Sequence, residues 1–505
     1  MRLSADDRIV VGQSSADEQN DAGSSADERS NEEFSADEWS VEELYSGEQI
    51  ATGCWKDARF QGTLSLALSA RIPLEVFEII IDVMDPPKLT VAALVCAAWY
   101  PRAMHKLYHT IEIRSRTSYN LLFKQCYASP RLKQWLASTC ELVANEQWDA
   151  FFEILKDKRD SNEDGSMESP QRRNKNNSDN HFLQALPSAL ASLMPCVHNL
   201  HIYRARLCFV HTDFFLALSR FESVKSLTLR NCGLNNITQL RRIVSAFPQL
   251  TDLTLYVYFA QQGAASYAGA SLSQPPPHMR LRYLDVNLND ERMAMFSDWM
   301  MHSGLCTSLA DLTVSPEVAS MAQIPLNKLL ETAGTSLISF RLSNGFNYGR
   351  SVHGSVLQNT ALRSWSFELQ LIERVAKDQG PRAVWTKAMN ELHGIFSTVR
   401  SRHLEYIKVK VRVPVGDSIL EPEQLGVVLE GLDLRGLHEV VSQPYFDALQ
   451  DVEVKIVLAP LTRHWQTRLH VDGIDLDSIG QQLQTMFHGI LQPWVARGIV
   501  AITWL

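Results

Sequence analysis

The 505-residue sequence lacks several features that would point to a particular class of protein. Its eight cysteines are scattered and form no Cys-x-x-Cys pair, which fits reduced cysteines inside a cell better than a zinc or redox site. The longest apolar run, residues 89–100, is too short to span a bilayer, and residues 1–30 contain no apolar core of a secretory signal. We therefore expect a soluble protein of the cytoplasm, the nucleus or both, with no membrane partner.

Signatures of enzymes are also missing. The chain contains no Gly-x-Ser-x-Gly elbow, no Walker loop, no Gly-x-Gly-x-x-Gly and no His-Glu-x-x-His. Gly416-Asp417-Ser418 resembles one hydrolase motif, but no Asp-x-x-His follows it. His198 and His201 span the start of an expected strand and would face opposite sides of it, which disfavours a metal site. The sequence predicts no catalytic residue, no cofactor and no metal, whereas an enzyme would require a clustered polar pocket.

Negative charge is concentrated at one end of the chain. Residues 1–50 hold fourteen acidic residues and three arginines, so the rest of the chain is close to neutral. Ser-Ala-Asp-Glu or Ser-Ala-Asp-Asp recurs there at residues 4, 15, 25 and 35. A segment with this charge and so little apolar surface cannot form a core, so we expect residues 1–66 to be a disordered acidic tail. No long basic face is visible, and nucleic acid is not an expected partner.

The segment after this tail is unusually apolar. Eight of the eleven residues from Leu74 to Met84 are apolar, more than one face of a surface helix needs. Pro73 can open a helix that runs to about Val83, and Asp85 can cap a second helix that runs from Lys88 through Trp99. A unit of this size cannot cover so much apolar surface by itself, so it packs on the rest of the chain or on another protein.

These residues resemble an F-box. The likeness lies in Ile72-Pro73-Leu74-Glu75-Val76, then Ile79 and Ile80, then Leu94-Val95-Cys96 and Trp99. It assigns residues 67–115 to an F-box and implies a helical hairpin that docks on a Skp-type linker protein and, through it, on a cullin–RING ubiquitin ligase. Ile72 replaces the usual leucine, and Ala97 and Ala98 stand where a basic residue commonly precedes Trp99. The residues expected to contact the linker are Pro73, Leu74, Ile79, Ile80, Val83, Leu94 and Val95. The alternative is that the same residues form the core of a larger helical domain.

Two segments connect the hairpin to the rest of the chain. Residues 116–157 have apolar positions three and four apart, which predicts a helical linker region. Residues 158–182 are almost entirely polar and are expected to be a disordered loop. The basic residues between 158 and 175 resemble a bipartite nuclear-import signal.

Residues 183–505 repeat one pattern, L-x-x-L-x-L with conservative replacements. Its nine copies are Val197/Leu200/Ile202, Val224/Leu227/Leu229, Leu250/Leu253/Leu255, Leu281/Leu284/Val286, Leu309/Leu312/Val314, Leu337/Phe340/Leu342, Leu362/Trp365/Phe367, Leu404/Ile407/Val409 and Leu449/Val452/Val454. A weaker tenth copy is Leu429/Leu432/Leu434. Helical patterns lie between the copies, so each unit is expected to be a short strand followed by a helix.

The repeats resemble degenerate leucine-rich repeats. This resemblance implies an α/β solenoid with a parallel sheet and helices on its convex side, which follows the all-helical F-box in the sequence. Only Cys232 and Asn289 occupy the Asn/Cys position that normally ties successive turns together, so an irregular solenoid is expected. An unrelated α/β domain with parallel strands is the alternative.

The two resemblances together imply the substrate-recognition subunit of an SCF-type ubiquitin ligase. The hairpin would hold the linker and the sheet would bind an unknown target protein. Outward-facing strand residues that could contact the target are Arg230, Tyr256, Asn287, Arg341, Lys408 and Lys410. The alternative is a scaffold without ubiquitin chemistry, whose hairpin only caps the first repeat.

Overall fold

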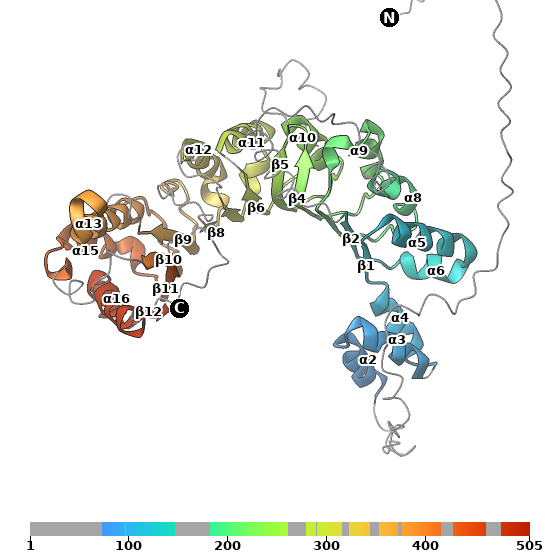
Figure 1. The fold of residues 1–505 in the computed structure, drawn as a ribbon, viewed down its shortest axis with the longest axis horizontal. Helices are drawn as coiled ribbons and strands as arrows, with labels where there is room; N and C mark the ends of the chain where they lie inside the picture. Colours follow the sequence, from blue (N-terminus) through green and yellow to red (C-terminus); the bar gives the residue numbers. More distant parts are fainter. Residues whose placement is uncertain are drawn as a thin grey trace, which may run out of the picture. The chain divides into compact units, whose positions relative to one another are not determined.

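The computed structural model describes residues 73–505, except for residues 96, 147–181, 261–278, 289, 316–322, 344–352, 372–375, 416–427 and 461–475. The expected acidic tail, the basic residues between 158 and 175, Asn289 and Gly416-Asp417-Ser418 all lie outside the described residues. The described chain begins with three short helices and continues into one long parallel sheet (Figure 1).

The three short helices are α2 (Leu74–Asp82), α3 (Pro86–Val95) and α4 (Tyr100–Leu107). Pro73 precedes α2 as its N-cap, as expected, and the helix ends at Asp82. The second helix stops at Val95, earlier than expected, and Tyr100-Pro101 opens a separate third helix because proline fits the first turn. These helices pack on one another, and we refer to residues 73–107 as the helical unit.

Twelve strands form a single sheet in which every strand is parallel to its neighbours and the spatial order follows the chain order. They are β1 (Thr110–Ile113), β2 (Glu141–Asn145), β3 (Asn199–Tyr203), β4 (Ser226–Leu234), β5 (Asp252–Phe259), β6 (Tyr283–Asn287), β7 (Asp311–Val314), β8 (Ser339–Leu342), β9 (Ser364–Gln370), β10 (Tyr406–Val415), β11 (Asp451–Pro460) and β12 (Val500–Trp504). This is a solenoid-like α/β architecture, which confirms the coarse fold class.

Helices follow most strands and cover one face of the sheet (Figure 1). They are α5 (Arg116–Ala128), α6 (Pro130–Leu136), α8 (Leu186–Leu190), α9 (Thr212–Leu218), α10 (Ile237–Ser245), α11 (Asp290–Ser303), α12 (Gln323–Ala333), α13 (Ala376–Phe396), α15 (Arg435–Val441), α16 (Leu476–Ile490) and α17 (Gln492–Val495). Short 3₁₀ turns are η4 (Phe182–Ala185), η5 (Leu207–Phe209), η7 (Leu305–Ser308), η8 (Gly334–Ser336) and η10 (Pro444–Phe446). Alternate strand residues, such as Leu253 and Leu255, point to these helices and form one continuous core.

The nine predicted L-x-x-L-x-L copies coincide with β3 to β11, one strand for each copy. The second and third apolar residues of every copy are buried. The weak tenth copy is not a strand, because residues 428–430 form a helical turn and α15 begins at Arg435.

The sheet is longer at both ends than the repeat pattern predicted. β1 lies inside the segment assigned to the F-box, and β2 lies inside the segment expected to be a helical linker. Residues 116–136 are helical as expected, but Leu142 and Ala144 then alternate with less buried neighbours and pair with β3. The sheet therefore begins at Thr110 rather than after residue 183, because the strand period of two takes over from the helical period.

Hydroxyl groups tie successive repeats together at the start of the strands. In five repeats, a serine or threonine at the first apolar position, or one to three residues before it, donates a hydrogen bond to the carbonyl at that position of the preceding strand unit, at 2.6–2.9 Å. The pairs are Thr139 to Tyr108, Ser223 to Val197, Ser308 to Leu281, Ser336 to Leu309 and Ser401 to Leu362. In the last turn the guanidinium of Arg497 takes this place and donates to the Leu449 carbonyl at 2.9 Å. We call these contacts the hydroxyl ladder.

Candidate functional site

The helical unit has a very small core of its own. Of its described residues only Ile81, Leu89, Ala92 and Ala103 are buried, and Met84, Ala93, Trp99 and Leu107 pack around them. The Trp99 ring lies 5.4 Å from the Phe77 ring and closes one side of this core. This cluster is separate from the core of the sheet.

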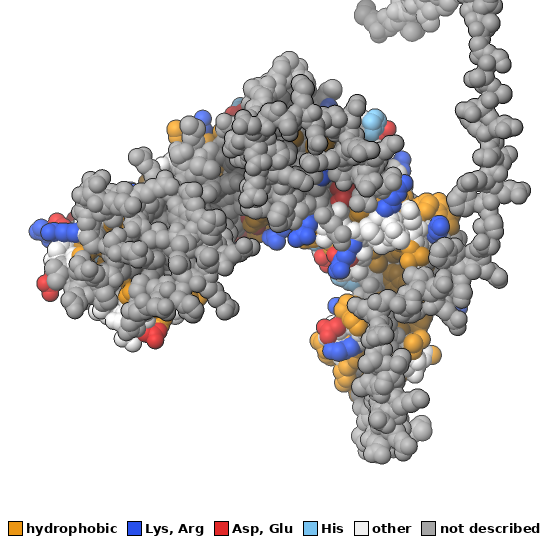
Figure 2. All heavy atoms as spheres, in the orientation of Figure 1, with side chains coloured by type: hydrophobic (Ala, Val, Ile, Leu, Met, Phe, Trp, Pro, Cys, Tyr) orange, Lys and Arg blue, Asp and Glu red, His pale blue; other side chains and the backbone are white. Residues whose placement is uncertain are grey.

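An apolar surface on the same helices remains uncovered. Leu94 is 86 % exposed and Ile79 is 65 % exposed, whereas Leu89 on the same helix as Leu94 is 2 % exposed. All seven residues predicted to contact a linker are exposed, and they are Pro73, Leu74, Ile79, Ile80, Val83, Leu94 and Val95. In Figure 2, hydrophobic side chains are prominent where Figure 1 draws α2 to α4. We call these residues, with Val76 and Val91, the apolar surface of the helical unit.

Sequence reasoning missed Val76 and Val91, which are 42 % and 53 % exposed. The signal that identifies Val91 is its position three and four residues before Leu94 and Val95, because residues with this spacing share one face of a helix. Burying each large aliphatic side chain stabilises by about 1.5–3 kcal/mol, so an exposed cluster of this size is typical of an interface.

One ion pair ties the first helix of the unit to the third. The Arg102 Nε donates to Asp82 Oδ1 at 2.8 Å, and a second guanidinium nitrogen contacts the other carboxylate oxygen. This hydrogen bonding to Arg102 holds the pKa of Asp82 below its ordinary value of 3.8. The bidentate pair links the end of α2 to α4.

The second candidate surface is the face of the sheet that points away from the helices, which we call the open face. Its side chains form rows across the strands, because paired residues of parallel strands lie side by side. The first row contains the residues in register with Asp252, the second row those in register with Thr254, and the third row those in register with Tyr256.

All six residues predicted to contact a target lie on the open face. Arg230, Tyr256 and Asn287 are neighbours in the third row. Arg341 and Lys408 belong to the second row, with Ser366 between them, and Lys410 belongs to the third. One face of the sheet thus carries all six side chains, although Arg230 on β4 and Lys410 on β10 lie six strands apart.

Arg230, Tyr256 and Asp285 form a connected group on three neighbouring strands. The Arg230 guanidinium lies 4.9 Å from the centre of the Tyr256 ring, and the Tyr256 hydroxyl donates to the Asp285 carboxylate at 3.2 Å. Asp285 is only 7 % exposed, and burial raises its pKa even though Tyr256, Arg230 and Arg341 act in the opposite direction. Within this group the Arg230 side chain is therefore exposed to solvent, whereas the Asp285 carboxylate is buried.

A second polar group lies on β9, β10 and β11. Glu368 is 2 % exposed and forms ion pairs with Arg412 and, at 3.8 Å, with Lys410. Burial raises the pKa of Glu368 against the attraction of these cations. Lys408 pairs with Glu453 on the neighbouring strand at 2.5 Å. Glu368 and Arg412 were not predicted, although they occupy the same alternating positions as Ser366 and Lys410.

His201 also lies on the open face, where its Nε2 is 3.2 Å from Glu141 and its ring stacks on Tyr203. Burial lowers the pKa of His201. No group of three or more histidine, cysteine or acidic side chains among the described residues could hold a metal ion.

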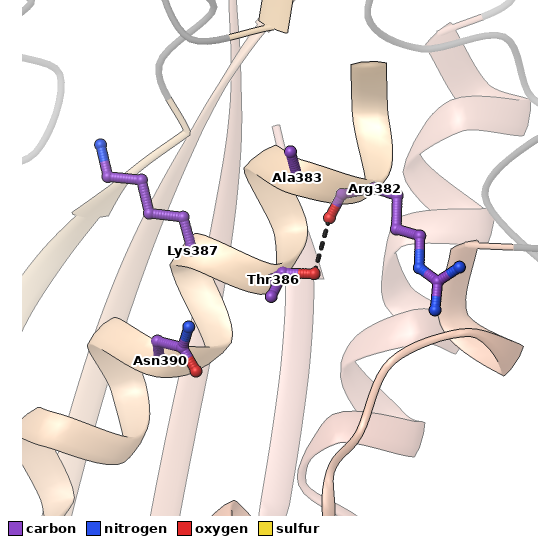
Figure 3. A pocket seen from close by; sticks show the side chains of 5 residues that line it. All are labelled: Arg382, Ala383, Thr386, Lys387 and Asn390. Atoms are coloured by element: carbon purple, nitrogen blue, oxygen red, sulfur yellow. Dashed lines mark hydrogen bonds between the residues drawn. The ribbon is translucent and has the colours of Figure 1, made fainter. Parts of the chain in front are cut away.

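A shallow cavity of about 470 Å³ lies along α13, on the helical side of the sheet (Figure 3). Arg382, Ala383, Thr386, Lys387 and Asn390 line it. The Thr386 hydroxyl donates to the Arg382 carbonyl at 2.9 Å, and the Arg382 and Lys387 side chains point away from each other. These residues do not converge on one point, so the two exposed surfaces remain the stronger candidates.

Comparison with known proteins gives no further constraint, because no protein-family model matches the chain and no curated protein matches it. Within the described part of the chain, none of the helices combines the length and apolar character needed to cross a membrane.

Proposed function

We propose that this protein is the substrate-binding subunit of an SCF-type cullin–RING ubiquitin ligase. The helical unit acts as an F-box that docks on a Skp-type linker protein, and the sheet belongs to a degenerate leucine-rich-repeat domain that holds the target. The observation that carries the proposal is the contrast on α3, where Leu89 is buried and Leu94 is 86 % exposed.

Several of the exposed residues are positions at which the sequence resembles an F-box. Leu74, Ile79 and Leu94 are motif residues, yet none of them belongs to the core of the helical unit. A protein that keeps these side chains in water gains stability only when a partner covers them. If the unit were merely a cap of the solenoid, these residues would be expected to pack on the first strand unit.

The strand-and-helix units support the second half of the proposal. Nine copies of one apolar pattern form neighbouring strands of one sheet, which is the arrangement expected of leucine-rich repeats. Cys232 occupies the Asn/Cys position, is buried, and donates its thiol hydrogen to the Ile202 carbonyl at 3.3 Å. The same repeat also contributes Ser223 to the hydroxyl ladder, so its two ends are each bonded to the preceding unit.

Under this proposal the chain brings the target close to the ubiquitin carrier and takes no part in the chemical step. Holding a target lysine near a charged ubiquitin carrier converts a bimolecular encounter into an effectively intramolecular reaction. The chain then needs two binding surfaces and no catalytic group. The apolar surface of the helical unit and the open face of the sheet meet that need.

Co-purification with a Skp-type linker protein tests the proposal. We expect the full chain to co-purify with the linker in a one-to-one complex, and the double variant Ile79→Gln, Leu94→Gln to lose it. The matched control is Leu216→Gln, Ile324→Gln, which removes two exposed aliphatic side chains from α9 and α12. If the unaltered chain is monodisperse alone and never retains the linker, the scaffold alternative is correct.

A further inference from the structure

Charge on the open face is sorted by row. The first row carries the acidic residues Glu141, Asp252, Asp311 and Asp451 and no lysine or arginine. The second and third rows between β4 and β11 carry the cations Arg230, Arg341, Lys408, Lys410 and Lys455. The face therefore changes from negative to positive along the direction of the strands.

Of the three carboxylates in these rows between β4 and β11, two are concealed, and the third, Glu453, is partly exposed and pairs with Lys408. Asp285 and Glu368 are 7 % and 2 % exposed, and each is already bonded to neighbours on the sheet. Arg230, Arg341 and Lys408, in contrast, are exposed. Among the described residues, Arg341 and Lys455 form no ion pair. The charge that a partner meets in these rows is positive.

We propose that the second and third rows of the open face bind an extended acidic peptide segment that crosses the strands, with its carboxylates on Arg341, Lys408 and Lys455. The idea that this peptide belongs to the target of a ligase rests on the function proposed above. The binding of an acidic peptide to these rows does not depend on that function. Charge complementarity carries the proposal, because the cations face solvent and the anions beneath them are satisfied.

The spacing of the cations fits a peptide chain. Arg341 on β8 and Lys408 on β10 lie in one row with a single strand between them, which places their backbones roughly 10 Å apart. A peptide in the extended polyproline II conformation rises about 3.1 Å per residue and presents the same face every third residue, so it covers that distance in about three residues. The segment is therefore expected to carry acidic side chains three positions apart.

Two features prepare the site for binding. Arg230 rests on the Tyr256 ring, so its guanidinium is held before the partner arrives. Lys408 is paired only with Glu453, and such an exposed pair is worth so little that a peptide carboxylate can replace it. The acidic first row disfavours a nucleic acid, whose phosphates would lie against it.

Fluorescence anisotropy on the full chain tests the proposal. The probe is a labelled twelve-residue Gly/Ser peptide with glutamate at every third position, compared with the same peptide carrying glutamine and with a single-stranded DNA of twelve nucleotides. The test variant is Arg341→Gln, Lys408→Gln. The control variant is Lys328→Gln, Lys387→Gln, which removes the same charge from exposed positions of α12 and α13.

We expect the glutamate peptide to bind, the glutamine peptide to bind about tenfold more weakly, and added salt to weaken binding. The test variant should lose about tenfold in affinity, and the control variant should match the unaltered chain. Equal binding of both peptides, equal loss in the two variants, or preferential binding of the DNA would each overturn the proposal.

The same reagents separate this inference from the proposed function. The Ile79→Gln, Leu94→Gln variant should retain the peptide and lose the linker, because neither residue lies on the sheet. The Arg341→Gln, Lys408→Gln variant should retain the linker and lose the peptide. Failure of one binding event therefore leaves the other measurable.

Discussion

The hydroxyl of Ser401 donates a hydrogen bond of 2.6 Å to the carbonyl of Leu362, which lies one strand unit earlier in the chain. Ser401 is 1 % exposed, so water cannot replace the bond. This contact belongs to the hydroxyl ladder, and it shows how a repeat that has lost its asparagines still holds its turns in register.

Removing this contact should destabilise the sheet. We expect Ser401→Ala to lower the free energy of unfolding by about 1–3 kcal/mol, because the Leu362 carbonyl loses a buried donor. Ser219→Ala is the matched control, since the exposed Ser219 hydroxyl donates only to Leu216 in its own helix turn. Urea unfolding followed by circular dichroism measures both. Equal effects of the two substitutions would show that the ladder contributes nothing specific.

Two leucines of α3 should respond differently to the same substitution. Leu89→Ala removes a buried side chain and should destabilise the helical unit by about 2–4 kcal/mol, whereas Leu94→Ala should change its stability by less than about 0.5 kcal/mol. Hydrogen exchange of residues 74–107, measured by mass spectrometry, reports the difference. A large effect of Leu94→Ala in the isolated chain would mean that this side chain is covered by the protein itself.

Asp285 should make the stability of the sheet depend on pH. Because burial raises its pKa above the ordinary 3.8, the native state favours the protonated carboxyl, and its stabilising contribution is lost as pH rises through the raised pKa. Asp285→Asn keeps an acceptor for Tyr256 and carries no charge. We therefore expect the variant to be the more stable protein at pH 7 and the difference to vanish below pH 3.8.

Urea unfolding of both proteins between pH 3 and pH 8 measures this difference, with Asp311→Asn as the control at an exposed first-row position. If Asp285→Asn is instead less stable at pH 7, attraction to Arg230 and Arg341 outweighs the cost of burial.

The cysteines should differ sharply in reactivity. Burial raises the pKa of Cys232 and of Cys306 to about 12, so almost none of either thiol is ionised at pH 8. Cys196 is exposed. We expect iodoacetamide to label Cys196 in the native protein and to label Cys232 and Cys306 only after unfolding, as measured by peptide mapping. Rapid native labelling of Cys232 would contradict its burial at the Asn/Cys position.

The sequence predicted the middle of the sheet well and its ends poorly. Nine strands follow from the L-x-x-L-x-L spacing because each buries two apolar residues against a helix. The same spacing exists at Tyr108/Ile111/Ile113, Thr139/Leu142/Ala144 and Ile499/Ile502/Trp504, which become β1, β2 and β12. Two of these copies begin with tyrosine or threonine, so a search for aliphatic residues passes over them. Thr139 is nevertheless well suited to its position, because its hydroxyl enters the ladder.

The candidate surfaces, like the sheet, were predicted from the sequence only in part. The excess of apolar residues in α2 and α3 predicted an uncovered surface, and the exposure of Leu94 agrees with it. The open-face residues followed from strand alternation alone. What periodicity could not reveal is which charges are concealed, because Asp285 and Glu368 are bonded to side chains of an adjacent strand that are about 30 to 40 residues away in the chain.

Every strand of the sheet pairs only with the strands before and after it in the chain. A pulling force applied to β1 and β12 would therefore meet contacts between neighbouring units along most of the sheet. Near β12 it would also meet the ring contacts of Trp385 with Phe487 and of Phe396 with Trp494, which skip one unit. The protein should therefore lengthen in steps, with each unit separating from its neighbour in turn rather than all units at once. Such compliance would let the protein extend under mechanical load and recover its shape without unfolding as a whole.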